Sequence, residues 1–485
     1  MTTPATALRR LKDLPCPRGW PVLGNALQLT RSRVHQDVEA WARQHGKLFR
    51  MRFPGVTMLV VADHELLAQA LRDRPEGWRR NPTTKTLSVE MGLPQGLFNA
   101  EGAAWAAQRR MVMASFAPGH IREYFPQLLK VAQRLQNRWL RAANAGQDLH
   151  LQPELMRYTV DTIAGLALGQ DINTLEAGED VIQQHLDKVL PAIFRRAFSL
   201  LPTWRWFKTR QDRMLDASVA VIKTEIARFV ALARAELERE PALRERPRNL
   251  LQSMIVAAQT ESGISDANVA GNVLTMLLAG EDTTANTLAW LIHLLHRHPE
   301  CLARARAEAH AVLGAAAGRP LELTLEMIDA LPYLDACISE TMRLKPVAPF
   351  ISLQALRDTT LGDVQVPAGT LLWGVFRHDS VSAGHFPEPL AFKPERWLDD
   401  GSAKGSNAKR VAMPFGAGPR MCPGRYLALL EMKVAMSMLL SAFNIESVQA
   451  PGGGEADEEM YFTMGPKGLV MRLGASLVST QRREA

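Results

Sequence analysis

The amino-acid sequence predicts a mainly α-helical fold with a minor β portion. From Ile121 to Arg343, apolar residues recur at three- and four-residue intervals, the spacing that places them on one face of a helix. From Val347 to Trp373 the chain carries short β-like pieces with Pro and Gly. Because no Ser/Gly linker or internal repeat divides the helical stretch, we expect a single domain over residues 25–475, preceded by a Pro-rich leader (1–24) and followed by a tail (476–485).

The composition is that of a globular protein with a mild positive charge. Apolar residues make up 47% of the 485 residues and charged residues 22%, which argues against a disordered chain. Lys and Arg outnumber Asp and Glu by 57 to 50, but no dense Lys/Arg run is interleaved with aromatic residues, so we expect no nucleic-acid partner. The excess is either a diffuse basic surface or a localised patch for an acidic partner.

The cysteines and the apolar runs indicate a reducing compartment and no membrane span. The four cysteines, Cys16, Cys301, Cys337 and Cys422, form no C-x-x-C pair, so neither a zinc cluster nor a disulfide framework is predicted. No uninterrupted apolar run reaches the ~18 residues of a transmembrane helix, and the N-terminal segment lacks the apolar stretch of a signal peptide. We therefore expect a cytoplasmic protein without a transmembrane anchor.

Local signals place the ends of several elements. Pro54-Gly55 separates two apolar runs and predicts a β-hairpin, after which Asp63 is a candidate N-cap of a helix. The remaining expectations are an extended leader over 14–24, a helix of about 30 residues between Ser265 and Pro299, an irregular segment over 386–421 and a last helix over 424–442.

A glycine-rich loop around Cys422 carries the strongest functional signal. Gly416 and Gly418 allow the backbone to approach closely around the sulfur, and backbone N–H groups and the start of the following helix can stabilise a thiolate. Arg420 adds a fixed cation two residues before the cysteine. The alternative is a buried structural cysteine, which we expect for the other three cysteines.

The segment Phe415–Gly424 matches the signature F-x-x-G-x-R-x-C-x-G at every fixed position, and so resembles the cysteine loop of the cytochrome P-450 family. The resemblance covers nearly the whole chain and implies the cytochrome P-450 fold, with a haem between a long central helix and the cysteine-loop helix. It also implies that Cys422 is the iron ligand. Phe415, Arg420 and Gly424 are expected to contact the cofactor, Arg420 through a haem propionate.

An acidic and a basic residue on one helix face resemble the E-x-x-R motif of the family. Glu340 and Arg343 form this pair, and Phe392–Trp397 resembles the P-E-R element that supplies a second arginine. A buried ion pair needs such additional partners, because desolvation can cancel its Coulomb gain. The implied role is to brace the cysteine loop. Alone, E-x-x-R would indicate an exposed helix pair.

The middle of the predicted long helix resembles the oxygen-binding bend of the family. Ala279-Gly280-Glu281-Asp282-Thr283-Thr284 is unfavourable in a helix interior and matches A-G-x-[DE]-T-T. A hydroxyl there can bond to the carbonyl of the previous turn, or turn toward a ligand and locally open the helix. The resemblance assigns Thr283 to oxygen stabilisation and water placement and Asp282 to a proton relay. The alternative is a polar stripe that faces solvent.

Trp105 and Arg109 resemble the W-x-x-x-R pair of the family, in which indole N–H and guanidinium reach one haem propionate. The alternative is a tryptophan that packs under an arginine.

Two departures affect the other propionate contacts. Many family members place an arginine near the position of Gln354, but residues 350–354 of this sequence contain none. In addition, Arg377-His378-Asp379 reverses the usual H-R-D order. The role of His378 is therefore open.

The resemblance implies a haem-thiolate monooxygenase. The cofactor would be haem b with O2 as co-substrate, and electrons from NAD(P)H would arrive through a ferredoxin, flavodoxin or flavin reductase. A separate donor is expected because the chain ends at Ala485, soon after the cysteine-loop helix, and shows no flavin or iron–sulfur domain. We also expect a monomer. The cations near the loop that could dock an acidic donor are Lys404, Lys409, Arg410, Arg425 and Lys433.

The substrate pocket should be apolar, so that fatty acids, terpenoids, steroids and aromatic compounds are all compatible. Residues 190–207 mix large apolar side chains with arginines, which suits a mobile lid, a weak membrane-surface contact or an ordinary amphipathic helix pair. The candidate wall residues, each of which could equally belong to the core, are Leu87, Val89, Phe98, Leu274, Leu278, Ala279, 347–351 and 462–464.

Two other functions stay open from the sequence. A peroxide-using or rearranging enzyme of the family needs no electrons, but such enzymes commonly lack the acid–alcohol pair that Asp282-Thr283 provides. A haem-based sensor or carrier would bind its ligand without turnover and would have no use for a proton relay. Reductant-dependent product formation separates both from a monooxygenase.

Overall fold

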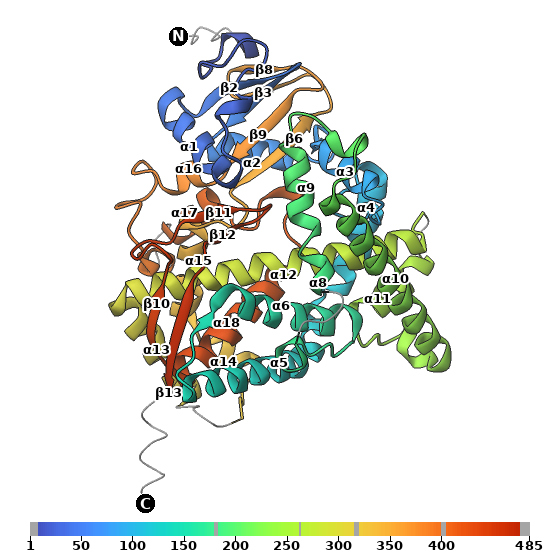
Figure 1. Cartoon of the computed structure of the whole chain (residues 1–485), viewed down its shortest axis with the longest axis vertical. Helices are drawn as coiled ribbons and strands as arrows, with labels where there is room; N and C mark the ends of the chain where they lie inside the picture. The colour runs from blue at the N-terminus through green and yellow to red at the C-terminus, as the bar shows by residue number, and fades with distance from the viewer. Residues whose placement is uncertain (1–7, 179–182, 261–262, 315–319, 399–403, 476–485) are drawn as a thin grey trace, which may run out of the picture.

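Helices make up most of the molecule, and a lobe of strands lies toward its N-terminal end (Figure 1). The computed structural model describes residues 8–178, 183–260, 263–314, 320–398 and 404–475. α12 (Asp266–Arg297) crosses the middle of the molecule, with the strand lobe above it and α5 (Pro118–Asn144) and α18 (Arg425–Ala442) below it in this view. The predicted mainly α fold with a minor β portion is confirmed.

The largest sheet has five strands in the order β2-β3-β9-β6-β4. β2 (Leu48–Phe53) and β3 (Val56–Val61) form the predicted hairpin, and β9 (Leu371–Val375) joins them to β6 (Phe350–Ala355). The edge strand β4 (Trp78–Arg80) pairs with β6 so that Arg79 lies opposite Gln354. Because successive side chains of a strand point to opposite faces, Arg80 is directed away from Arg79.

Smaller sheets tie the two ends of the described chain into the fold. Arg9 pairs with Asp363 at 2.7 Å and Leu14 is buried, so the leader from residue 8 onward packs against the strand lobe. The expected tail over 476–485 lies outside the described residues. The strands of these sheets are β1 (Arg9–Arg10), β7 (Thr359–Leu361) and β8 (Val364–Val366); β5 (Leu149–His150), β10 (Phe443–Gln449) and β13 (Val470–Ala475); and β11 (Glu458–Met460) with β12 (Met464–Pro466).

The other helices pack around α12 or against the strand lobe. None of the helices in the described ranges is both long and apolar enough to cross a membrane. These helices are α1 (Val34–His45), α2 (His64–Arg72), α3 (Pro82–Glu90), α4 (Gly102–Ser115), α6 (Leu151–Leu168), α7 (Thr174–Ala177), α8 (Gln183–Leu186), α9 (Val189–Ala197), α10 (Arg210–Arg239), α11 (Leu250–Thr260), α13 (Pro299–Leu313), α14 (Leu325–Asp329), α15 (Pro332–Leu344), α16 (Arg377–Ser380) and α17 (Lys404–Ala412).

The predicted caps are present. The Asp63 carboxylate accepts hydrogen bonds from the backbone N–H groups of Glu65 and Leu66, and so begins α2. Ser265 begins α12 with a reciprocal capping box to Asn268. These local signals located the helix starts because a cap depends only on residues within one turn.

α17 lies within the segment 386–421 that was expected to be irregular, and this expectation is wrong for residues 404–412. Its sequence contains Gly, Ser and Asn, which are weak helix formers. Val411 and Ala408 are nonetheless buried in a cluster with Trp397 and Phe386. Packing against distant residues, rather than local propensity, therefore holds this helix.

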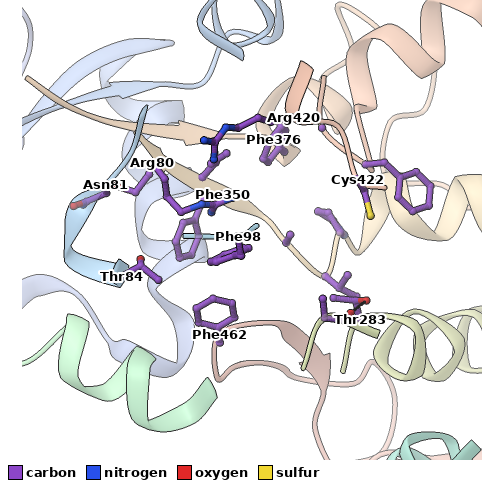
Figure 2. A pocket seen from close by; sticks show the side chains of 18 of the residues that line it. Arg80, Asn81, Thr84, Phe98, Thr283, Phe350, Phe376, Arg420, Cys422 and Phe462 are labelled. Carbon is purple, nitrogen blue, oxygen red and sulfur yellow. Dashed lines mark hydrogen bonds between the residues drawn. The ribbon is translucent and has the colours of Figure 1, made fainter. Parts of the chain in front are cut away.

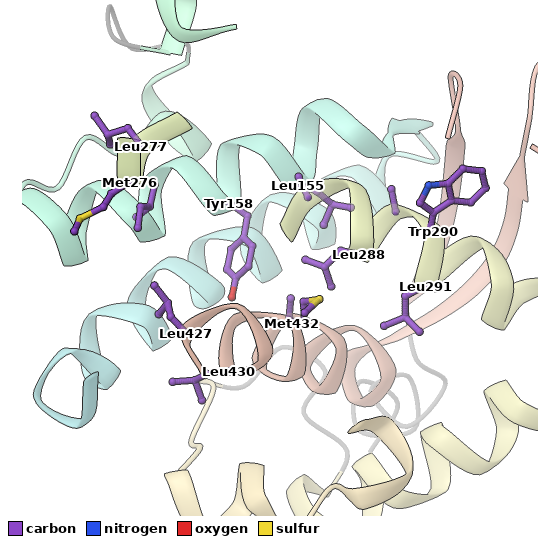
Figure 3. Packing of buried hydrophobic residues seen from close by; sticks show 14 of the residues in the cluster. Leu155, Tyr158, Met276, Leu277, Leu288, Trp290, Leu291, Leu427, Leu430 and Met432 are labelled. Carbon is purple, nitrogen blue, oxygen red and sulfur yellow. The ribbon is translucent and has the colours of Figure 1, made fainter. Parts of the chain in front are cut away.

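The main core lies between α6, α12 and α18 (Figure 3). Leu155, Leu288 and Met432 come from these three helices and are buried. The hydroxyl of Tyr158 in α6 donates a hydrogen bond at 3.1 Å to the backbone carbonyl of Glu431 in α18. Burial of apolar surface, at ~25 cal/mol per Å², holds α12 in place above the cysteine-loop helix.

The E-x-x-R pair is fully buried. The Glu340 carboxylate lies 2.7 Å from Nε of Arg343, and both side chains have no exposed surface. Arg396 reaches the same carboxylate at 3.0 Å, and the indole N–H of Trp397 donates to it at 2.8 Å. The four groups satisfy one another, so the predicted pairing with the P-E-R element is present.

We predict that Glu340→Gln lowers the free energy of unfolding by about 3–5 kcal/mol, because it leaves the buried guanidinium of Arg343 and the partly buried one of Arg396 without a counter-charge. The measurement is urea unfolding followed by tryptophan fluorescence. The matched control is Glu395→Gln, whose half-exposed carboxylate pairs with half-exposed Arg304 at 3.0 Å and should contribute about 0–1 kcal/mol. Equal losses for the two variants would contradict the prediction.

Candidate functional site

A cavity of about 1000 Å³ lies between α12 and the loop that contains Cys422. In Figure 2, Cys422 and Thr283 lie on one side of the cavity, and Arg80, Phe98 and Phe462 lie on the other. Most of the lining is apolar and aromatic. A cavity of this size accommodates a large planar group together with a small organic molecule.

A backbone hydrogen bond closes the loop before α18, and the loop packs against the end of α2. The Cys422 N–H donates to the carbonyl of Phe415 at 3.1 Å, which closes the loop. Gly418 has φ +72°, and a Cβ there would lie 2.4 Å from the carbonyl oxygen of Leu71. Glycine is therefore required at this position by both conformation and space. The loop fixes the sulfur at the cavity wall.

The Cys422 side chain is exposed at the cavity wall, and Phe415, Arg420 and Gly424 line the same cavity. Desolvation by the surrounding protein raises the pKa of the Cys422 thiol, whereas the Gly424 N–H and the charge of Arg109 lower it. A bound metal cation would favour the thiolate outright. This cysteine therefore has the environment of a metal ligand, with stabilising dipoles and a sulfur that faces open space.

Two guanidinium groups and one backbone N–H converge on the Glu101 carboxylate at the edge of the cavity. Arg420 pairs with Glu101 at 2.5 Å, and Arg74 lies 3.9 Å from the same carboxylate. The backbone N–H of Arg80 donates to Glu101 at 2.9 Å, and its side chain lines the cavity. One negative charge thus faces three buried or half-buried positive charges.

These guanidinium groups retain unused donors. Buried nitrogens of Arg74 (Nε and Nη2), Arg80 (Nε) and Arg420 (Nε) find no hydrogen-bond partner among the described residues. Burial and mutual repulsion lower the pKa of Arg74 to about 9 and that of Arg80 to about 10. A bound anion would satisfy these donors and relieve the repulsion. The residues present therefore fit the two carboxylates of a haem bound beside Cys422.

Trp105 and Arg109 lie one turn apart on α4, and both line the cavity. The Arg109 guanidinium donates to the carbonyl of Met421 at 2.8 Å, directly beside the cysteine. The Arg420 guanidinium lies over the Trp105 ring at 4.7 Å from its centroid. The α4 pair is thus placed at the same edge of the cavity as the guanidinium cluster.

Arg74 and Arg80 were missed by sequence reasoning. Arg80 supplies a cation in the region where the sequence lacks an arginine near Gln354. β4 pairs with β6, and Arg79 donates to Gln354 Oε1 at 2.6 and 2.8 Å while Arg80 enters the cavity. The tandem Arg79-Arg80 in a short strand was a usable signal, since one of two neighbours must face inward. Arg74 carried no sequence signal.

His378 is placed away from the cavity. Its Nδ1 lies 3.1 Å from Asp379, whose carboxylate also binds the N-terminal N–H of α2 at His64. His378 is not among the described residues that line the cavity. Its contact here is with the carboxylate of Asp379.

Thr283 and Asp282, although adjacent, face different surroundings. Thr283 lines the cavity, and its hydroxyl donates to the carbonyl of Ala279 at 2.6 Å. α12 is continuous through this turn, so the helix is not opened as the bend motif suggested. Asp282 is not part of the described lining. It is half-buried, and the hydroxyl of Thr463 hydrogen-bonds to it.

The acids around α12 have raised pKa values. Burial, with a smaller contribution from the Asp187 carboxylate, raises the pKa of Asp282 to about 6. Burial also raises the pKa of Glu281. Glu431 on α18 lines the cavity, and burial raises its pKa to about 8 although the Thr284 hydroxyl bonds to it. Asp282 can therefore exchange protons near neutral pH, as a relay requires.

The cavity walls match only part of the predicted set. Phe98, Ala279, Val347, Ala348, Phe350, Ile351 and Phe462 line the cavity. Leu87, Leu274 and Met464 are buried core residues instead, and Val89 is exposed. Leu278, Pro349 and Thr463 are likewise outside the described lining, whereas Pro346, Thr275 and Met276 were missed.

Residues 190–207 form a cavity wall rather than a pair of helices. α9 ends at Ala197, and only the short η4 (Thr203–Arg205) follows it before α10. Phe194 and Phe198 line the cavity. The helix-pair alternative is therefore wrong, whereas the lid and membrane-surface alternatives are both compatible with a wall.

A cysteine that faces an apolar cavity, with arginines at the edge of that cavity, is the arrangement of a haem-thiolate protein. The chain belongs to the cytochrome P450 family, whose family model matches residues 14–472.

The chain is similar to several curated members of this family. It is 28% identical over 449 residues to a self-sufficient cytochrome P450 monooxygenase of Oidiodendron maius, covering 90% of this chain and 40% of that protein. It is 27% identical over 448 residues to a bifunctional cytochrome P450/NADPH–P450 reductase of Bacillus subtilis, with 90% and 40% covered. Identity to the chloroplastic protein LUTEIN DEFICIENT 5 of Arabidopsis thaliana is 25% over 423 residues, covering 84% of this chain and 68% of that protein. The chain thus spans about two fifths of the first two relatives.

We predict that Arg80→Met raises the rate of haem loss to an excess of acceptor apoprotein by roughly tenfold or more, because hydrogen bonds to charged groups contribute ~1.5–3 kcal/mol. The matched control is Arg79→Met, since that guanidinium bonds to Gln354 rather than facing the cavity. The measurement is the absorbance change during haem transfer. Equal rates for both variants would show that Arg80 does not hold the cofactor.

Proposed function

We propose that this chain is a haem-thiolate monooxygenase that inserts one oxygen atom of O2 into an apolar organic substrate, by hydroxylation or epoxidation. The observation that carries the proposal is one apolar cavity that Cys422 and Thr283 both line. Membership of the cytochrome P450 family supports it, and so do two relatives, one a self-sufficient monooxygenase and the other a fusion with a P450 reductase. The protein is further proposed to be cytoplasmic and monomeric.

The proposed cofactor is haem b. When bound, a haem ligated by a cysteine thiolate supplies oxygen activation and the cleavage of a C–H bond. The Cys422 thiolate would be the iron ligand, and the Gly424 N–H and Arg109 favour its charged form. Arg80 and Arg420, with Trp105 and Arg109 on α4, would hold the propionates at the cavity edge.

Thr283 and Asp282 are proposed to deliver protons. The Thr283 hydroxyl is on the cavity side of α12 and can hold a water molecule there. Asp282 is half-buried, and its raised pKa lets it take up and release a proton near neutral pH. Because Asp282 does not face the cavity, the path to Thr283 passes along α12 through water rather than by direct contact.

The walls of the cavity orient the substrate and exclude water. Phe98 and Phe462 have ring centroids 6.1 Å apart, and Phe350 packs on Trp373 at 4.4 Å. Such walls favour a substrate with little polar surface, and fatty acids, terpenoids, steroids and aromatic compounds are all candidates.

The proposed electron donors are a ferredoxin, a flavodoxin or a flavin reductase, with electrons from NAD(P)H. A reductase portion on the same polypeptide is the second candidate, because the Bacillus subtilis relative is named as such a fusion. Lys409, Arg410 and Arg425 are exposed near the cysteine loop, and Arg72 at the end of α2 adds a fourth cation. Lys433, which was expected among the docking cations, is excluded, because its side chain is only 13% exposed and lies 3.9 Å from Asp335. The side chain of Lys404 is outside the described set.

The test of the function is isotopic. A panel of apolar compounds is screened by the shift of the haem absorption, and a positive compound is then oxidised under labelled O2 with a reductant. We expect one labelled oxygen atom in the product. Thr283→Ala should retain substrate binding but divert reductant to peroxide, because the hydroxyl acts after oxygen binds.

The matched control is Thr275→Ala. Thr275 also lies on α12 and lines the cavity, and its hydroxyl likewise donates to the carbonyl of the preceding turn, that of Gly271, at 2.7 Å. Its ratio of product to reductant should stay near that of the wild type. Product without labelled oxygen, or product formed without reductant, would contradict the proposed function. An unchanged ratio in Thr283→Ala would contradict only the relay.

We predict that Lys409→Glu/Arg410→Glu slows reduction by an acidic ferredoxin and weakens its dependence on ionic strength, because exposed charges mainly steer association. The measurement is the stopped-flow rate of reduction as salt is varied. The matched control is Arg141→Glu/Lys223→Glu, two exposed cations on α5 and α10. Rates that respond to neither salt nor charge reversal would exclude this docking face.

A further inference from the structure

Two histidines and one aspartate meet where α2 begins, away from the cavity. His64 is the first residue of α2, Asp379 lies in α16, and His385 follows α16 in a turn. Each of the three side chains offers one ligand atom, and these atoms lie within 4.8 Å of one another. None of the three residues belongs to the described lining of the cavity. The cluster is therefore a separate feature of the fold, built from two segments far apart in the sequence.

The Asp379 carboxylate lies at the centre of this cluster. Its Oδ2 atom lies 2.8 Å from Nδ1 of His64 and 3.5 Å from Nε2 of His385. The rings of these two histidines meet edge to face, with centroids 4.7 Å apart. Nδ1 of His378 lies 3.1 Å from the other carboxylate oxygen. Two imidazoles thus flank one oxygen of the carboxylate, and a third imidazole holds the other oxygen.

The buried imidazole of His64 is only half satisfied. Its side chain is 5% exposed, and Nε2 finds no hydrogen-bond partner among the described residues. A carboxylate only accepts hydrogen bonds, so a neutral ring carries its proton on Nδ1, toward Asp379, and its lone pair on Nε2. If Nδ1 instead binds a metal ion, the proton moves to Nε2. Oε1 of Glu65 lies 4.0 Å from Nε2 on a side chain that is 65% exposed, and it can accept that proton in a hydrogen bond.

The protonation states of the cluster suit a metal site. Burial opposes ionisation of Asp379, but hydrogen bonds from His378, His64 and Lys47 outweigh it and lower the pKa of the carboxyl. Burial lowers the pKa of the His385 imidazole. The carboxylate is therefore ionised and His385 is neutral near pH 7. These are the states in which both groups bind metal ions.

Lys47 supplies the positive charge that faces Asp379 in this structure. Its Nζ atom lies 3.0 Å from Asp379 and 3.2 Å from Asp63. The side chain is 40% exposed, so the ammonium group can turn outward and keep Asp63 as its partner. A metal ion and Lys47 therefore compete for the same carboxylate.

We propose that His64, Asp379 and His385 form a binding site for a zinc ion. Its protein ligands are Nδ1 of His64, Oδ2 of Asp379 and Nε2 of His385. Two imidazole nitrogens and one carboxylate oxygen are a ligand set that zinc binds, with a water molecule at the fourth position. His378 orients the carboxylate from its other oxygen, and Glu65 accepts the Nε2 proton of His64.

The zinc ion ties the beginning of α2 to α16 and to the turn that follows it. The other end of α2 contacts the cysteine loop, where Gly418 packs on the carbonyl of Leu71. Because the unfolded chain does not bring the three ligands together, zinc binds the folded protein preferentially and stabilises it. This role is independent of the proposed monooxygenase function.

The test uses the full-length haem-loaded protein without a histidine tag, after metal ions have been removed by a chelator. Competition with a fluorescent zinc chelator gives the stoichiometry and the Kd. We expect one zinc ion per chain. X-ray absorption at the zinc edge should show nitrogen and oxygen neighbours only. A sulfur neighbour would assign the ion to a cysteine and overturn the proposal.

His385→Gln removes one ligand and should weaken zinc binding by at least about 100-fold, because losing even a residue that orients a ligand costs about 10–100-fold. The matched control is His185→Gln. His185 is also half-buried, and burial lowers its pKa too, but it contacts the Ser218 hydroxyl at 3.0 Å. The control should keep the wild-type Kd. Equal affinities of His385→Gln and the wild type would contradict the site.

Lys47→Met removes the competing cation and should tighten zinc binding by about fivefold, the equivalent of one partly exposed ion pair. A variant that fails to fold cannot bind more tightly, so this result does not depend on the stability of His385→Gln. The matched control is Lys130→Met, whose ammonium group pairs with Asp171 at 2.7 Å and should not affect zinc. Unchanged or weaker binding by Lys47→Met would show that zinc does not displace Lys47 from Asp379.

Urea unfolding measures the proposed stabilisation. Free zinc at about 100 times its Kd should raise the folding equilibrium constant of the wild type about 100-fold, by mass action. The same zinc concentration should leave His385→Gln nearly unchanged, and the haem absorption reports whether each variant is folded at the start. A wild-type protein that zinc does not stabilise, or that takes up no zinc in competition with the chelator, would overturn the proposal.

Discussion

The buried carboxylate of Glu340 is the constraint on which the position of the cysteine loop depends. Arg343 and Arg396 both pair with it, and the Trp397 indole donates to it. Arg343 also donates to the carbonyls of Pro389 and Ala391. A carboxylate without exposed surface is costly unless each oxygen is satisfied, so the surrounding loops are held where their donors are needed.

The same network reaches the site through packing. Trp397 is buried in one cluster with Val411 and Ala412 of α17, and α17 leads directly into the loop that ends at Cys422. On the other side, Gly418 lies against the end of α2, where any larger residue would clash with Leu71. The sulfur is therefore fixed from both sides, while α12 is held across the cavity by its own core. The guanidinium groups of Arg74, Arg80 and Arg420 keep buried nitrogens without partners among the described residues, which suits the binding of an anion there.

Much of this site could be predicted because its motifs are local. The loop around Cys422, the Thr283 motif on α12 and the cap at Ser265 each depend on residues within a few positions. Arg80 was not found, because its direction depends on the register of β4 against β6, which brings Arg79 opposite Gln354. Asp282 illustrates the same limit: its neighbour Thr283 lines the cavity, but the helix phase turns the Asp282 side chain toward Thr463.

The central claim is that Cys422 is the ligand of a haem iron, and the reduced, carbon-monoxide-bound protein tests it most directly. The wild type should absorb near the wavelength characteristic of thiolate ligation, and Cys422→Ser should lose that band. Cys301→Ser and Cys16→Ser are the controls, because neither cysteine lines the described cavity, and both variants should keep it. A Cys422→Ser protein with the wild-type band would contradict the account.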